Sequence, residues 1–168
     1  MTDLSKYTSL RVGGPAKKII QVSNEAEIIA AIEQAGDSPV LILGGGTNLL
    51  VSDKGFDGTV IRISNNSVKA EVDACSGATL TIGAGEDWDT FVQTTIDRGY
   101  AGLETLSGIP GTVGAAPIQN IGAYGVELKD VFISCEAMNI QTQELRTFNK
   151  EECDFGYRNS IFKEEISD

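Results

Sequence analysis

The chain has 168 residues, of which 41% are hydrophobic and 22% charged, a size and balance typical of a globular protein with its own core. Its 13 Lys and Arg against 24 Asp and Glu give a net charge of -11, which disfavours nucleic acid and anionic membranes as partners. The sequence contains no histidine, which excludes histidine metal ligands and the Ser-His and Cys-His nucleophile pairs.

The N-terminus and the cysteines favour a cytoplasmic protein. The first ten residues, MTDLSKYTSL, have neither the basic start nor the apolar stretch of a signal peptide. No apolar run approaches the roughly 20 residues of a membrane-spanning helix. Cys75, Cys135 and Cys153 are far apart and odd in number, so we interpret them as reduced, mostly buried thiols rather than zinc ligands or a disulfide framework. We therefore expect a cytoplasmic monomer without a bound metal ion.

Residues 1–60 predict a strand, a helix and a second strand, the pattern of a β-α-β unit. Ser23 or Asn24 can cap the helix, and Gly36 can end it. The three elements are expected over residues 17–22, 25–35 and 40–43.

The second strand leads directly into a glycine-rich loop, LGGGTNLL over residues 43–50. Glycines let successive N–H groups point into one concavity, which suits a pyrophosphate. In so acidic a chain we expect an anion to be held by these N–H groups rather than by a basic patch. The loop lacks the Lys of a P-loop, and Leu49 stands where the dinucleotide fingerprint GxGxxG requires its third glycine. A tight turn after a buried strand is the alternative for this loop taken alone.

The rest of the chain predicts a mainly antiparallel run of strands with one long helix, and therefore an α+β fold with a boundary near residues 64–67. Asp87 can cap the helix and Gly99 can end it. Asn149 with Glu152 predicts a further helix start of the capping-box kind. Strands are expected over residues 59–63, 68–74, 79–83, 131–140 and 144–148.

A second glycine-rich stretch covers residues 107–125 and combines small residues, two prolines and two amides. Small residues permit close approach to a flat ligand, and the amides of Gln119 and Asn120 can bond to the edges of a heterocycle. A plain surface loop of 19 residues with so few charges is unusual, so we expect a ligand-binding loop.

A third stretch, CDFGYRNSIFK over residues 153–163, places Arg158 among aromatic and polar neighbours. A lone arginine is most often a surface or salt-bridge residue. The alternative is a guanidinium held by packed neighbours beside a flavin or a carboxylate, where it is a fixed positive charge.

Together these three stretches resemble the FAD-binding part of the UDP-N-acetylenolpyruvoylglucosamine reductase family. The resemblance covers essentially the whole chain in order. Three further motifs carry it: TSLRVGGPA over residues 8–16, VSD over 51–53 with Gly55 and Phe56, and GAG over 83–85 with Trp88.

The resemblance implies a two-lobed α+β fold of the vanillyl-alcohol-oxidase (PCMH) type, with residues 1–65 as the first lobe and 66–168 as the second. FAD is expected between the lobes, bound non-covalently, with its pyrophosphate on the first glycine loop and its rings along the second. The implied cofactor contacts are Gly44, Gly45, Gly46, Thr47, Asn48, Leu49, Ser107, Gly108, Ile109, Pro110, Gly111, Thr112, Gly114, Ala115, Gln119, Asn120, Ile121, Gly122, Ala123, Tyr124 and Gly125.

The resemblance also implies a reaction of peptidoglycan precursor synthesis. NADPH passes a hydride to the flavin, and the flavin passes it to the enolpyruvyl group of UDP-N-acetylglucosamine enolpyruvate, which yields UDP-N-acetylmuramate. Arg158 is expected to stabilise the enediolate charge as the catalytic residue, with Tyr157 beside the substrate. Asn159 stands where the family commonly has Asp, a neighbour expected to orient the arginine.

The chain departs from the family in one respect. The family's proton-donating serine and its glutamate belong to a C-terminal substrate domain, and neither Ser160 nor Ser167 has the context of that serine. We therefore expect an N-terminal portion of the enzyme that is inactive alone. The alternatives are a flavin oxidase of the same fold, although without histidine it cannot attach FAD through that residue, and a flavin-binding module without catalysis.

Overall fold

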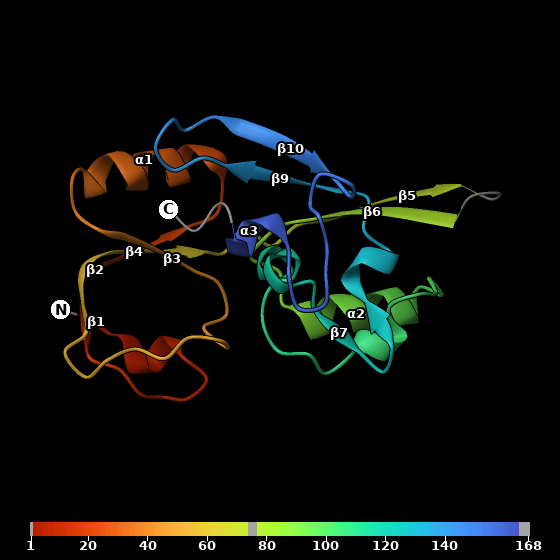
Figure 1. The fold of residues 1–168 in the computed structure, drawn as a ribbon, viewed down its shortest axis with the longest axis horizontal. Coiled ribbons are helices and arrows are strands. Elements are labelled where there is room, and N and C mark those ends of the chain that lie inside the picture. Colours follow the sequence, from red (N-terminus) through yellow and green to blue (C-terminus); the bar gives the residue numbers. More distant parts are fainter. Residues whose placement is uncertain (1, 74–76, 165–168) are drawn as a thin grey trace.

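The computed structural model describes residues 2–73 and 77–164, so the interpretation of Cys75 lies outside the described residues. Figure 1 shows a sheet with helix α1 (Glu25–Ala35) at one end of the long axis of the molecule. Helix α2 (Trp88–Asp97) lies in the other half of the molecule, among the loops of the second glycine-rich stretch.

The sheet at the first end has the strand order β1-β2-β4-β3. Strand β4 lies between β2 and β3 and is parallel to both, whereas β1 is antiparallel to β2. Because β2, β3 and β4 are parallel, their carboxyl ends meet at one edge of the sheet. The strands span Thr2–Asp3 (β1), Pro15–Val22 (β2), Val40–Leu43 (β3) and Phe56–Ile63 (β4).

The remaining strands form two-stranded antiparallel sheets in the described part of the chain. Strand β5 (Val68–Asp73) pairs with β6 (Gly77–Ile82), and β9 (Ser134–Met138) pairs with β10 (Leu145–Asn149). The shorter elements are β7 (Gly122–Ala123), β8 (Val126–Glu127), α3 (Ile161–Glu164) and the 3-10 turns Leu4–Tyr7, Glu104–Leu106, Val113–Ala115, Pro117–Gln119 and Leu128–Asp130.

Separate apolar clusters stabilise the two ends. Ala31 of α1 packs with Val22 and Ile61 on one face of the sheet. Trp88 of α2 is buried in another cluster, and its indole N–H donates to the Leu106 carbonyl at 2.9 Å. This bond satisfies the indole donor and attaches the start of the second glycine-rich stretch to α2.

Most of the predicted elements are confirmed, with their caps. Asn24 and Asp87 accept the N-cap hydrogen bonds of α1 and α2, and Gly36 ends α1 at φ +54°. The strand predicted over 131–140 is shorter and begins at Ser134.

The prediction of a helix start at residue 149 is wrong: no helix begins there, although both hydrogen bonds of the predicted capping box form. The N–H of Asn149 donates to the Glu152 carboxylate and the N–H of Glu152 to the Asn149 side chain, each at 2.9 Å. The chain completes one turn and leaves it at Asp154, whose φ is +43°. A left-handed residue cannot continue a right-handed helix, so the local cap yields only a turn.

Candidate functional site

The first glycine loop lies at the carboxyl edge of the parallel strands, the usual ligand-binding edge of such sheets. Gly46 has φ +64°, and a Cβ there would lie 1.9 Å from the carbonyl oxygen of Tyr7. The Gly46 carbonyl in turn accepts from the N–H of Ser9 at 3.1 Å. Glycine is therefore required at this position by backbone packing against the N-terminal segment.

The two glycine-rich stretches come into contact. A Cβ on Gly45 would lie 3.2 Å from the Cα of Gly111, and one on Gly44 would lie 2.6 Å from Oγ1 of Thr112. The Thr47 hydroxyl also approaches the Pro110 carbonyl at 3.5 Å. Residues 44–47 and 110–112 thus form one small-residue wall.

A cavity of about 780 Å³ lies beside this wall, within the roughly 300–1,000 Å³ of small-molecule sites. Residues 5–9, Arg11, Gly44, Gly45 and Arg62 line it. Three cations therefore face one space next to a glycine loop.

Among the described residues, Lys129 pairs with Glu127 and Arg146 with Glu152, and neither ion pair involves Lys6, Arg11 or Arg62. Hydrogen bonds from Ser5 and, through space, the charge of Lys6 lower the pKa of Asp3. Arg62 lies over the Tyr7 ring, 5.5 Å from its centroid, and donates to the Gln21 side chain at 3.3 Å. Cations that form no ion pair, beside a glycine-rich loop whose backbone N–H groups can donate, are the donor set that a pyrophosphate requires. The residues present fit the FAD that the sequence resemblance implies.

Sequence reasoning missed these cations because it expected backbone N–H groups to act without a basic patch. Two signals were available. Arg11 belongs to the TSLRVGGPA motif, and Arg62 lies at the carboxyl end of β4, beside the end of β3.

Residues of the second glycine-rich stretch that do not belong to the wall differ in their contacts and burial. Ser107 and Gly108 are fixed on α2, because the Gly108 N–H and the Ser107 hydroxyl each donate to Asp89 at 2.7 Å. These two bonds hold the pKa of Asp89 below its ordinary value. Asn120 and Ile121 are buried, and Tyr124 is 92% exposed.

Arg158 lies at the second glycine-rich stretch rather than among the residues that line the cavity. Its Nη2 donates to the Gly122 carbonyl at 3.1 Å, and its own carbonyl accepts from Lys163 Nζ at 3.0 Å. The neighbouring Tyr157 is 85% exposed. Arg158 has φ +54°, an uncommon conformation for any residue but glycine.

The cysteines of the described part are free thiols. Cys153 is completely buried, and burial raises the pKa of its thiol to about 12. Cys135 is partly exposed, and burial also raises the pKa of its thiol. The described thiols are therefore protonated and weakly nucleophilic at neutral pH.

Residues 16–148 match the FAD binding domain family. The chain belongs to this family, and its α+β fold is of the PCMH type that the resemblance implied.

Individual proteins similar to this chain indicate which member of the family it resembles. The chain is 45% identical over 164 residues to the UDP-N-acetylenolpyruvoylglucosamine reductase of Cutibacterium acnes, covering 96% of this chain and 44% of that protein. It is 43% identical over 165 residues to that of Flavobacterium johnsoniae, covering 98% of this chain and 49% of the relative. The solved structure of the Thermus caldophilus reductase matches with a TM-score of 0.75 and 32% identity, over 94% of this chain and 54% of that one.

These matches confirm the resemblance carried by the sequence motifs. The chain spans about half the length of these relatives. Within the residues that the structure describes, none of the helices has the length and apolar character needed to cross a membrane.

Proposed function

We propose that this chain binds FAD non-covalently and serves an enzyme that uses NADPH to reduce UDP-N-acetylglucosamine enolpyruvate to UDP-N-acetylmuramate. The observation that carries the proposal is the contact of two glycine-rich stretches beside a cavity lined by three cations. The names of the relatives supply the reaction.

In this proposal the N–H groups of residues 44–48 hold the pyrophosphate, and Lys6, Arg11 and Arg62 neutralise its charge. Residues 107–125 lie along the rings. The two lobes are residues 1–65 and 66–168. At this boundary the N–H groups of Gly85 and Gly83 donate to the carbonyls of residues 65 and 67 at 3.0 and 2.7 Å, which attaches the end of the first lobe to the second.

A bound FAD would accept a hydride from NADPH and, once reduced, would supply it to the enolpyruvyl double bond. Arg158 places a permanent positive charge where the substrate carboxylate develops enediolate character, and Tyr157 flanks the same position. An always-charged planar guanidinium suits a carboxylate better than a compact ammonium does. The proposal also places the protein in the cytoplasm as a monomer, with NADPH as the hydride donor.

A chimera tests this function. The chain replaces the matched segment of the Cutibacterium acnes relative, and the purified protein receives NADPH and the enolpyruvyl substrate. We expect flavin-dependent formation of UDP-N-acetylmuramate. A flavin that NADPH reduces but that reacts only with oxygen would favour a flavin oxidase. A bound flavin that NADPH does not reduce would favour a non-catalytic module, and either result contradicts the proposal.

A further inference from the structure

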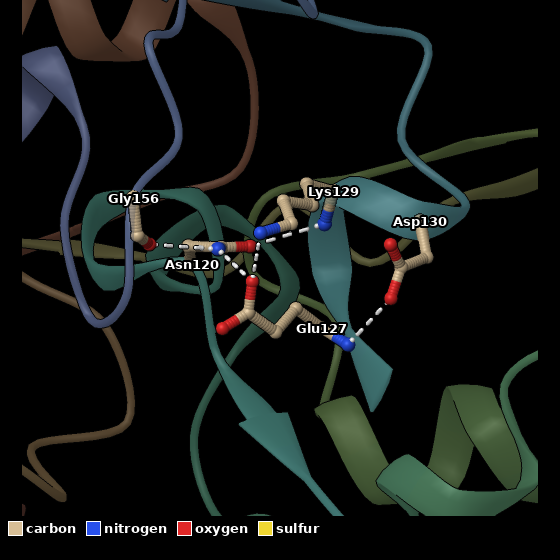
Figure 2. A network of polar contacts seen from close by, with 5 residues as sticks. All are labelled: Asn120, Glu127, Lys129, Asp130 and Gly156. Atoms are coloured by element: carbon tan, nitrogen blue, oxygen red, sulfur yellow. Dashed lines mark hydrogen bonds and ion pairs between the residues drawn. The ribbon is translucent and has the colours of Figure 1, made fainter. Parts of the chain in front are cut away.

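Asn120 lies at the centre of a hydrogen-bond network that joins three segments of the chain (Figure 2). Its Nδ2 donates to the Gly156 carbonyl at 2.9 Å and to Oε2 of Glu127 at 3.0 Å. Its Oδ1 accepts from the backbone N–H of Lys129 at 3.0 Å. One side chain thus connects the second glycine-rich stretch, the 3-10 turn at Leu128–Asp130 and the stretch that carries Arg158.

This amide has no donor left for a ligand. Both of its N–H bonds are used inside the protein, and the residue is only 1% exposed. Its backbone adopts the left-handed conformation, with φ +42°, which asparagine tolerates better than most residues. The expected bond from Asn120 to the edge of a heterocycle is therefore replaced by a bond to the chain itself.

The Gly156 carbonyl closes the turn in which Arg158 lies. It accepts from the Asn159 N–H at 3.3 Å as well as from Asn120, and the Gly156 N–H donates to the Asn159 carbonyl at 3.0 Å. Between these two residues, Arg158 adopts φ +54°. The side chain of Asn120 thus holds the base of a turn whose tip carries the guanidinium.

Two further bonds attach the same turn to the same stretch. The Arg158 guanidinium donates to the Gly122 carbonyl at 3.1 Å, and the completely buried Ser160 donates to the Ile118 carbonyl at 2.8 Å. Asn120 lies between these two anchor points in the sequence. The turn is therefore held at its tip by Arg158, at its base by Asn120 and just after its end by Ser160.

Glu127 orients the Asn120 amide. Its carboxylate accepts one N–H of the amide and pairs with Lys129, and the bonds from Lys129 and Asn120 keep the pKa of Glu127 below its ordinary value. The carboxylate stays ionised at neutral pH and fixes the direction of one N–H. The second N–H then points to Gly156, as Figure 2 shows.

We propose that Asn120 is a positioning residue that holds the Gly156–Asn159 turn, and through it the Arg158 guanidinium, in its working place. The inference deepens the proposed function, since it rests on the role of Arg158 there. Asn120 touches neither substrate nor cofactor in this account.

Two variants that differ at one position isolate the bond to Gly156. Glu127→Gln alone keeps an acceptor for Asn120 and leaves the Gly156 bond in place. Asn120→Asp combined with Glu127→Gln reverses donor and acceptor between residues 120 and 127, but no donor remains for Gly156. Asn24→Asp is the control for added charge, because Asn24 acts only as an N-cap acceptor, which Asp replaces equally well.

Amide hydrogen exchange over residues 153–160 of the 168-residue chain is the first measurement. We expect exchange about 10-fold faster in the double variant than in Glu127→Gln, because a buried hydrogen bond is lost. The Asn24→Asp control should exchange as the unsubstituted chain does. Equal exchange in the double variant and Glu127→Gln would show that Asn120 does not hold the turn.

Half-reactions in the chimera are the second measurement. We expect the double variant to reduce the substrate about 10-fold more slowly than Glu127→Gln, with flavin reduction by NADPH unchanged. A merely structural role would slow both half-reactions or neither, and would overturn the positioning role. If the unsubstituted chimera does not reduce the substrate, the proposed function fails, and the exchange result still decides whether Asn120 holds the turn.

Discussion

Four residues other than glycine adopt left-handed backbone at or beside the proposed site: Arg11, Asn120, Tyr124 and Arg158. Elsewhere in the described chain only Gln143 and Asp154 do so. Such residues are uncommon and concentrate where surrounding structure enforces them, which includes binding and catalytic sites. No sequence pattern predicts them, because the conformation depends on contacts with distant segments, such as the one between Arg158 and Gly122.

Arg158→Lys tests the role of the guanidinium. A lysine retains the charge but cannot donate to the Gly122 carbonyl and a carboxylate from one rigid plane. In the chimera, we expect the substrate half-reaction to slow about 100-fold, the scale for loss of one preorganised donor. Flavin reduction by NADPH, followed by stopped-flow absorbance, should stay near normal. Equal slowing of both half-reactions would contradict the assignment.

The buried thiol of Cys153 predicts a loss of stability in alkali. Its pKa is raised to about 12 in the folded chain, from an ordinary value of 9.0. Below pH 9 the thiol is protonated in both states and stability does not depend on it. Between about pH 9 and pH 12 only the unfolded chain loses the proton, so the free energy of unfolding falls by up to about 1.4 kcal/mol per pH unit.

Urea unfolding at about pH 8 and about pH 11, under reducing conditions, checks this prediction. Cys153→Ala should show a smaller decrease in the free energy of unfolding between the two pH values than the unsubstituted chain. An identical decrease would mean that other groups cause the alkaline loss.

At the scale of elements, caps and periodicity predicted α1, α2 and β3 because these elements depend on local interactions. The N-caps Asn24 and Asp87 are examples. The turn after β10 could not be predicted in this way. Its capping box is complete, but the direction of the chain after Asp154 is set by bonds from Asn120 and Ser160 to distant segments.

The sequence predicts that the glycines of the first loop form an anion-binding loop. It does not predict why glycine is needed at each position. Gly46 is required by the Tyr7 carbonyl, whereas Gly45 approaches Gly111 only moderately closely. Sequence alone cannot separate the two, since both reasons arise from segments remote in the chain. Because the two glycines are needed for different reasons, substituting each should have a different effect.

Gly45→Ala and Gly46→Ala should therefore differ. Gly45→Ala should fold and bind FAD about 10-fold more weakly, because a small shift of the loop weakens a hydrogen bond to a charged phosphate. Gly46→Ala should lower the melting temperature, since left-handed backbone alone costs about 1–2 kcal/mol before the clash is counted. Thermal melts and fluorescence titration with FAD check both. A stable Gly46→Ala with normal FAD affinity would refute the packing argument.

At the scale of the whole molecule, positive side chains are concentrated at one cavity of an acidic chain. The net charge is -11, yet Lys6, Arg11 and Arg62 line one cavity and belong to neither ion pair seen among the described residues. Net charge is a sum over the chain and does not reveal such a local concentration. The cavity is lined by residues 5–9, 11, 44, 45 and 62, which only the tertiary fold brings together. Composition could not show this, and the net charge therefore favoured an anion site made of backbone N–H groups alone.

Arg62→Gln tests the contribution of the cations. We expect FAD affinity to fall by several-fold, roughly the effect of one partly exposed charge, and to depend less on salt than in the unsubstituted chain. Titrations at low and high ionic strength measure both. Lys69→Gln, on the exposed strand β5, is the matched control and should change neither quantity. An unchanged affinity in Arg62→Gln would remove that cation from the site.

The most direct test of the central claim is a visible absorption spectrum of the purified 168-residue chain after incubation with excess FAD and gel filtration. We expect a flavin band to elute with the protein, and denaturant to release the flavin completely into the small-molecule fraction. A folded chain that carries no flavin would contradict the account, and so would flavin that stays attached after denaturation.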